Sequence, residues 1–129
     1  MQVNLLQSNR TFGARYLGMD KDGVRKSEII INNPKGIHAR PATEIINLLK
    51  LNENEGDVFI SRTEGERNPI RDSLLSLLML ALSQGTIVFL ETEPSYSEDF
   101  HNAIARCFEA PDDDAHAQVA LDFQENYNK

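Results

Sequence analysis

The spacing of apolar residues along the chain predicts alternating short strands and helices. Apolar positions recur at i, i+3, i+4 and i+7 from Ala42 onward, which predicts an amphipathic helix over residues 39–51. Ser73 and Ser97 each precede a further helical pattern and are typical N-caps, so helices are expected over 73–82 and 97–109. Apolar runs bounded by turn residues predict strands over 27–33, 57–62, 67–71 and 86–92.

The resulting order of elements, β-α-β-β-α-β-α, indicates an α+β fold with a four-stranded antiparallel sheet and three helices on one face. Pro69 cannot donate a ladder hydrogen bond, so the strand that contains it is expected at an edge. We divide the chain into an N-terminal extension (1–26), one domain (27–110) and an acidic C-terminal tail (111–129). The pattern of the tail fits either a weak helix or a disordered segment, and the sequence leaves both open.

Length and charge narrow the class of protein. A chain of 129 residues suits one domain with appendages. Its net charge of −7 argues against nucleic acid and anionic membranes as partners and leaves basic protein surfaces as candidates. No apolar run is long enough to span a membrane, and the N-terminus lacks a signal-peptide core. The single cysteine, Cys107, fits a reducing compartment, so a cytoplasmic monomer is expected.

Residues 35–42, Lys-Gly-Ile-His-Ala-Arg-Pro-Ala, carry the strongest chemical signal. They place His38 where a loop turns into the first helix, with Gly36 permitting a sharp turn and Pro41 tolerated in the first helical turn. The unpaired amides at such a helix start, those of Ala39 and Arg40, form an anion site together with the helix dipole.

The side chains suit phosphoryl chemistry as well. The guanidinium of Arg40 matches phosphate oxygens, and a neutral imidazole is nucleophilic near pH 7. This pattern indicates that His38 carries a phosphoryl group, the alternative being an exposed cap histidine without a function.

Other chemistry has little support in the sequence. His101, His116 and Cys107 show no metal-ligand spacing, and the glycines form no phosphate-binding loop. We therefore expect no metal and no cofactor.

Two segments resemble one known family. Residues 36–42, Gly-Ile-His-Ala-Arg-Pro-Ala, are similar to the active-site signature of the histidine-containing phosphocarrier (HPr) family of the bacterial phosphotransferase system. Residues 72–86 are similar to its second segment, in which a serine opens a short helix and a glycine leads into the last strand. Together the similarity covers about residues 27–110, and it implies an open-faced β-sandwich.

The resemblance also implies a function in sugar transport. The phosphoryl group of phosphoenolpyruvate would pass to enzyme I, then to Nδ1 of His38, and then to a sugar-specific or regulatory acceptor protein. Arg40 and the helix amides would stabilise the phosphoryl group. Such a protein is a co-substrate of phosphotransferases rather than a complete enzyme.

A regulatory role is implied for Ser73, because the matching serine is the target of a kinase in many family members. Asp72 stands where a basic residue is common and would repel a phosphate, so capping of the helix remains the alternative. The family docks partners on the face that would hold Leu74, Leu75 and Leu78, although the extension or the tail could instead cover these leucines.

Two other functions stay open at this point. One is a regulatory protein-binding module of HPr type that is controlled by phosphorylation and inactive in sugar transport. The other is a structural adaptor that retains the motif.

Overall fold

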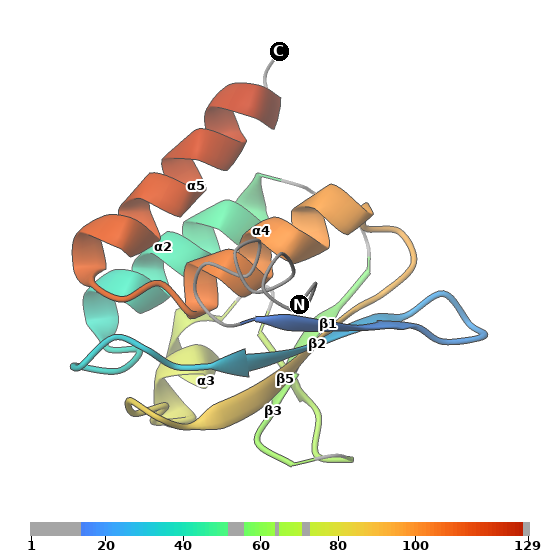
Figure 1. Cartoon of the computed structure of the whole chain (residues 1–129), viewed down its shortest axis with the longest axis horizontal. Helices are drawn as coiled ribbons and strands as arrows, with labels where there is room; N and C mark the ends of the chain where they lie inside the picture. Colours follow the sequence, from blue (N-terminus) through green and yellow to red (C-terminus); the bar gives the residue numbers. More distant parts are fainter. Residues whose placement is uncertain (1–13, 52–55, 64, 71–72, 128–129) are drawn as a thin grey trace, which may run out of the picture.

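The computed structural model describes residues 14–51, 56–63, 65–70 and 73–127, which form one antiparallel sheet and a layer of helices (Figure 1). The strands pair in the order β1-β2-β5-β3-β4. Their bounds are Arg15–Met19 for β1, Arg25–Ile30 for β2, Val58–Ser61 for β3, Asn68–Pro69 for β4 and Ile87–Thr92 for β5. The expected α+β fold is confirmed, and the short strand with Pro69 lies at an edge as predicted.

The sheet has five strands, where four were expected, because β1 lies in a stretch without a clear pattern. Its residues are mostly exposed, so no period-two alternation of apolar residues marks it in the sequence. A turn aligns it with β2: the Asp20 carboxylate accepts hydrogen bonds from the amides of Asp22 and Val24. β1 is therefore defined by pairing with its neighbour rather than by a local apolar signal.

The three predicted helices are present as α2 (Ala39–Lys50), α3 (Leu74–Met79) and α4 (Glu98–Phe108). Ser73 and Ser97 cap α3 and α4, since their hydroxyls accept hydrogen bonds from the amides of Ser76 and Phe100. Figure 1 shows α2 and α4 above one face of the sheet. In the part of the chain that is described, no helix combines the length and apolar character needed to cross a bilayer.

The tail forms a fourth helix, α5 (Asp113–Tyr127), which decides between the two alternatives left open by the sequence. α5 packs against α2 and α4 (Figure 1). Val119 and Ala120 are buried in this contact, and the ring of Phe123 meets that of Phe100 edge-on at 5.3 Å. Burial of this apolar face, rather than helix propensity alone, holds the tail in place.

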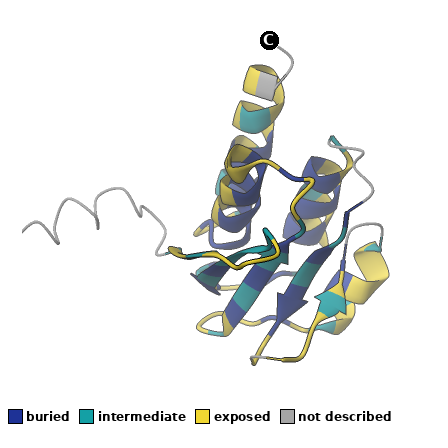
Figure 2. Cartoon of the chain, turned by 90° about the vertical axis from the view of Figure 1, so that its right-hand side faces the viewer, coloured by how far each residue is buried: buried dark blue, intermediate teal, exposed yellow. Residues whose placement is uncertain are grey.

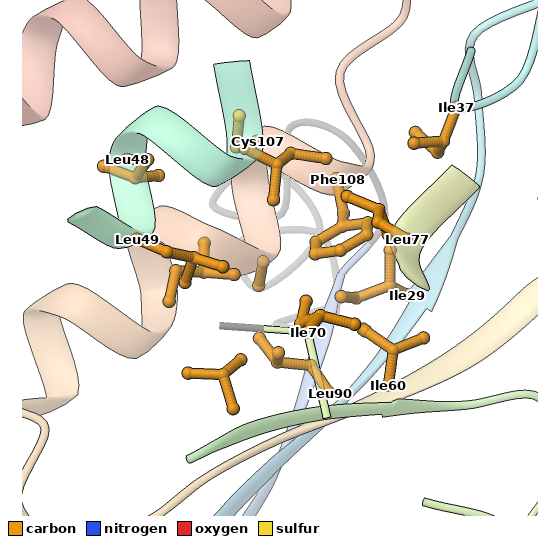
Figure 3. Close-up of a cluster of buried hydrophobic side chains, with 14 of the residues drawn as sticks. Ile29, Ile37, Leu48, Leu49, Ile60, Ile70, Leu77, Leu90, Cys107 and Phe108 are labelled. Atoms are coloured by element: carbon orange, nitrogen blue, oxygen red, sulfur yellow. The ribbon is translucent and has the colours of Figure 1, made fainter. Parts of the chain in front are cut away.

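The core lies between the sheet and the helical layer, where the buried residues gather (Figure 2). Strands, α2, α3 and α4 all contribute to it, as Figure 3 shows for Ile29, Ile60, Leu90, Leu48, Leu49, Leu77 and Phe108. The helix that carries His38 is thereby fixed on the sheet by its apolar face.

A buried histidine lies in this core and has a structural role. The ring nitrogens of His101 make hydrogen bonds with the hydroxyls of Ser27 (Nε2, 2.7 Å) and Thr92 (Nδ1, 2.8 Å). Burial, assisted by the positive charge of Arg25, lowers the pKa of His101 from 6.5 to about 4. His101 is therefore neutral at physiological pH and links β2, β5 and α4.

Candidate functional site

His38 is the N-cap residue of α2, as the sequence predicted, with an extended backbone (φ −88°, ψ −164°). The loop before it depends on Gly36, whose φ is +71°, and a Cβ there would lie 2.4 Å from the carbonyl oxygen of Leu82. The amide of Ile37 donates to that same carbonyl at 2.8 Å. Only glycine fits this approach, and the loop places His38 beside the segment that follows α3.

The first turn of α2 presents two unpaired amides. Ala42 makes the first intrahelical bond, to the carbonyl of His38 (3.0 Å), and Pro41 has no N–H. The amides of Ala39 and Arg40 donate to no group among the described residues, and the His38 side chain does not cap them. These two amides lie at the positive end of the helix dipole, where an anion is stabilised.

The His38 ring is partly exposed, and its one hydrogen bond to a described residue joins Nε2 to Oδ1 of Asp113 (3.0 Å). Asp113 is the first residue of α5. The Asn33 side chain donates to the same oxygen at 2.9 Å, and this bond, together with the hydrogen bond and charge of His38, keeps the pKa of Asp113 below its usual value. Asp113 is therefore ionised at neutral pH and can only accept a hydrogen bond.

It follows that Nε2 of His38 carries the hydrogen. In the neutral ring the lone pair then resides on Nδ1, which forms no hydrogen bond with the residues that the structure describes. A partly exposed ring with its lone pair on one unbonded nitrogen is suited to nucleophilic attack.

Arg40 follows His38 by two residues in the first turn of α2, and its side chain is held loosely. Its guanidinium contacts Oδ1 of Asp114 at 3.2 Å, and the exposed fractions of the two side chains are 56% and 93%. An ion pair this exposed contributes little stability, so Arg40 can exchange Asp114 for a phosphate at small cost. A pocket of about 320 Å³ adjoins it and brings together Asn33, Pro34, Lys35, Arg40 and Asp112–Asp114.

The other candidate residues lie on and before α3. Leu74 and Leu75 are exposed (37% and 66%), whereas Leu78 is partly buried against the core. Asp72 lies outside the described residues. Within the described ranges, no group of three or more metal-ligating side chains occurs, and Cys107 is buried.

Sequence reasoning missed Asn33 and Asp113. Asp112, Asp113 and Asp114 follow Pro111 and precede an apolar pattern, which is a typical helix start, so the position of α5 could have been found. Nothing local indicates that this start lies against His38, because Asp113 is 75 residues away along the chain.

Comparisons with known proteins agree with this geometry. Residues 25–110 match the family model described as "PTS HPr component phosphorylation site". The phosphocarrier protein HPr of Mycoplasma pneumoniae is 27% identical over 86 residues, which cover 67% of this chain and 94% of that protein. The crystal structure of a phosphocarrier protein HPr from Bacillus anthracis superposes with a TM-score of 0.54 at 23% identity, covering 64% of this chain and 93% of that one. The resemblance seen in the sequence is thus confirmed, and the chain belongs to the HPr family of phosphotransferase-system components.

Proposed function

We propose that this protein is a phosphoryl carrier that accepts a phosphoryl group from enzyme I on His38 and passes it to a sugar-specific or regulatory acceptor protein. The observation that carries the proposal is the position of the His38 ring at the start of α2, with Nε2 paired with the Asp113 carboxylate and Nδ1 without a hydrogen-bond partner among the described residues. Membership of the HPr family supports the same reading.

Phosphoryl transfer requires a nucleophile and groups that stabilise the negative charge on the phosphoryl oxygens. The lone pair of Nδ1 forms a bond to phosphorus while the bond from phosphorus to the donor's leaving atom breaks, and the leaving atom keeps that electron pair. The amides of Ala39 and Arg40, with the Arg40 guanidinium, stabilise the phosphoryl oxygens. In release, a nucleophilic atom of the acceptor forms a bond to phosphorus while the bond from phosphorus to Nδ1 breaks, and its electron pair returns to Nδ1, so the ring regains its starting state.

α3 supplies a docking surface for these partners. Leu74 and Leu75 are exposed next to Met79, which is 74% exposed, so the described residues leave this face uncovered. Exposed apolar side chains grouped on one short helix favour contact with another protein. The Ile37–Leu82 hydrogen bond connects the loop before His38 to the segment after α3. A partner bound at α3 therefore has the phosphorylation site within its reach.

Ser73 is proposed as a second, regulatory phosphorylation site. Its hydroxyl accepts a hydrogen bond from the amide of Ser76 (2.9 Å) at the N-terminus of α3. A phosphate there can keep the capping bond through one of its oxygens, and it adds negative charge next to Leu74 and Leu75. Such a modification by a serine kinase would repel acidic groups on a docked partner without unfolding α3.

The proposal is tested by labelling the full chain with enzyme I and isotopically labelled phosphoenolpyruvate. We expect the wild type to take up phosphate that is labile to acid and stable to base, as phosphohistidine is, and we expect His38→Ala to take up none. Thermal unfolding of both proteins checks that the variant is folded. Labelling of His38→Ala, or no labelling of the wild type, would contradict the proposal.

A further inference from the structure

We propose that Asp113 is a positioning residue for phosphoryl transfer, which holds the hydrogen of the His38 ring on Nε2 and so presents Nδ1 as the nucleophile. Asp113 lies beyond the residues that match the family model, 25–110, and is supplied by the additional helix α5. The inference rests on the proposed function of His38 as the phosphoryl acceptor.

The Asp113 carboxylate is held from two sides. Asn33 donates to its Oδ1 (2.9 Å), and the side-chain oxygen of Asn33 in turn accepts from the amide of Lys35 (2.9 Å). Asp112 caps α5, because its carboxylate accepts from the amide of Ala115 (2.8 Å). The carboxylate is thus oriented both by its own helix and by the loop that leads to His38.

α5 itself is anchored well beyond this turn. His116 is fully buried one turn after Asp112, and its Nδ1 makes a hydrogen bond with the carbonyl of Cys107 in α4. The Asn32 side chain donates to the carbonyl of Glu109 at 2.8 Å, which ties the loop after β2 to the end of α4. Together with the buried Val119, these contacts fix the start of α5 against the His38 loop. Asp113 therefore lies at a helix start that is anchored to the fold by buried contacts.

The pairing has a chemical consequence at the moment of transfer. When neutral His38 attacks phosphorus through Nδ1, a bond to phosphorus forms, the donor's bond breaks, and the ring becomes an imidazolium that still carries its hydrogen on Nε2. The positive charge forms on the ring, whose Nε2 lies 3.0 Å from Oδ1 of Asp113. The phosphoryl group is bonded to the other ring nitrogen, Nδ1. Because Coulomb energy falls with distance, each unit of charge on the ring interacts more strongly with the carboxylate than each unit of charge on the phosphoryl group.

The neighbouring carboxylate has a different role. Asp114 contacts Arg40 rather than the ring, and it is 93% exposed. It competes with a phosphoryl group for Arg40, while Asp113 does not. The two adjacent carboxylates are therefore expected to act in opposite directions.

The test compares Asp113→Ala and Asp113→Asn with Asp122→Asn in the full chain. Asp122 is an exposed carboxylate on the same helix that accepts a hydrogen bond from Gln118 (2.7 Å), so its substitution controls for charge and for α5. Nitrogen NMR of the unphosphorylated protein reports which ring nitrogen of His38 carries the hydrogen. Labelling with phosphoramidate, which releases ammonia as its P–N bond breaks, reports the reactivity of Nδ1 without enzyme I.

For the wild type and Asp122→Asn we expect the hydrogen on Nε2 and phosphorylation at Nδ1. Asp113→Ala should give a mixture of ring tautomers, several-fold slower labelling at Nδ1 and a larger share of product at Nε2. Asp113→Asn should be intermediate, because its amide oxygen can still accept from Nε2.

The inference would be overturned if, in Asp113→Ala, the ring hydrogen of His38 stays on Nε2 and the labelling rate is unchanged or faster. The proposed function fails separately, if phosphoramidate labels His38 with the expected dependence on Asp113 but enzyme I does not label the wild type.

Discussion

The buried His101 should make the stability of this protein depend on pH between 6.5 and about 4. Its pKa is near 4 in the folded chain, against 6.5 when solvated, so within this window the unfolded chain binds a proton that the folded chain does not. Stability is therefore full above pH 6.5 and falls as the pH drops towards 4. At 1.36 kcal/mol per pKa unit, a shift from 6.5 to about 4 corresponds to about 3 kcal/mol.

A loss of this size is a large part of the 5–15 kcal/mol that stabilises a typical domain. Urea unfolding of the wild type and of His101→Gln at several pH values from 7 to 4 would measure it. The variant should be less stable at pH 7, because Ser27 and Thr92 lose their ring partner, but its stability should fall by about 3 kcal/mol less over this range. Equal slopes for the two proteins, or an NMR titration of His101 near 6.5, would refute the reasoning.

Two backbone positions give opposite predictions for stability, both measurable by urea unfolding. Gly36→Ala should destabilise by about 1–3 kcal/mol, because the new Cβ would lie 2.4 Å from the Leu82 carbonyl at a φ of +71°, and a loss below 0.5 kcal/mol would contradict the loop geometry. Ala81→Gly should stabilise by about 0.5–1 kcal/mol, because Ala81 has a φ of +51° that glycine adopts without strain. A less stable Ala81→Gly protein would argue against that left-handed conformation.

The parts of the fold that could be predicted are those with a local signal. Ile45, Ile46 and Leu49 repeat at helical spacing and are buried in α2, and the serines before α3 and α4 cap them as expected. β1 carried no such signal, since its residues are largely exposed and its register comes from β2. The tail was ambiguous in the sequence, because its apolar face stabilises a helix only when it packs against α2 and α4.

The candidate site likewise contains residues with a local sequence signal and residues without one. His38, Ala39 and Arg40 are neighbours in sequence, so their position at a helix start followed from Gly36 and Pro41. The partner of the ring could not be predicted, because the hydrogen bonds that Asp113 accepts from His38 and from Asn33 join residues 75 and 80 positions apart. Contacts of that range depend on how α5 packs, which no local pattern specifies.

The role proposed for His38 is tested most sharply by locating the phosphoryl group after transfer from enzyme I. Phosphorus and nitrogen NMR of the nitrogen-labelled, phosphorylated chain would show which residue and which ring nitrogen carry it. We expect one phosphoryl group on Nδ1 of His38, with the hydrogen retained on Nε2 opposite Asp113. A phosphoryl group on Nε2 of His38, or on any other residue in its place, would contradict the proposed role.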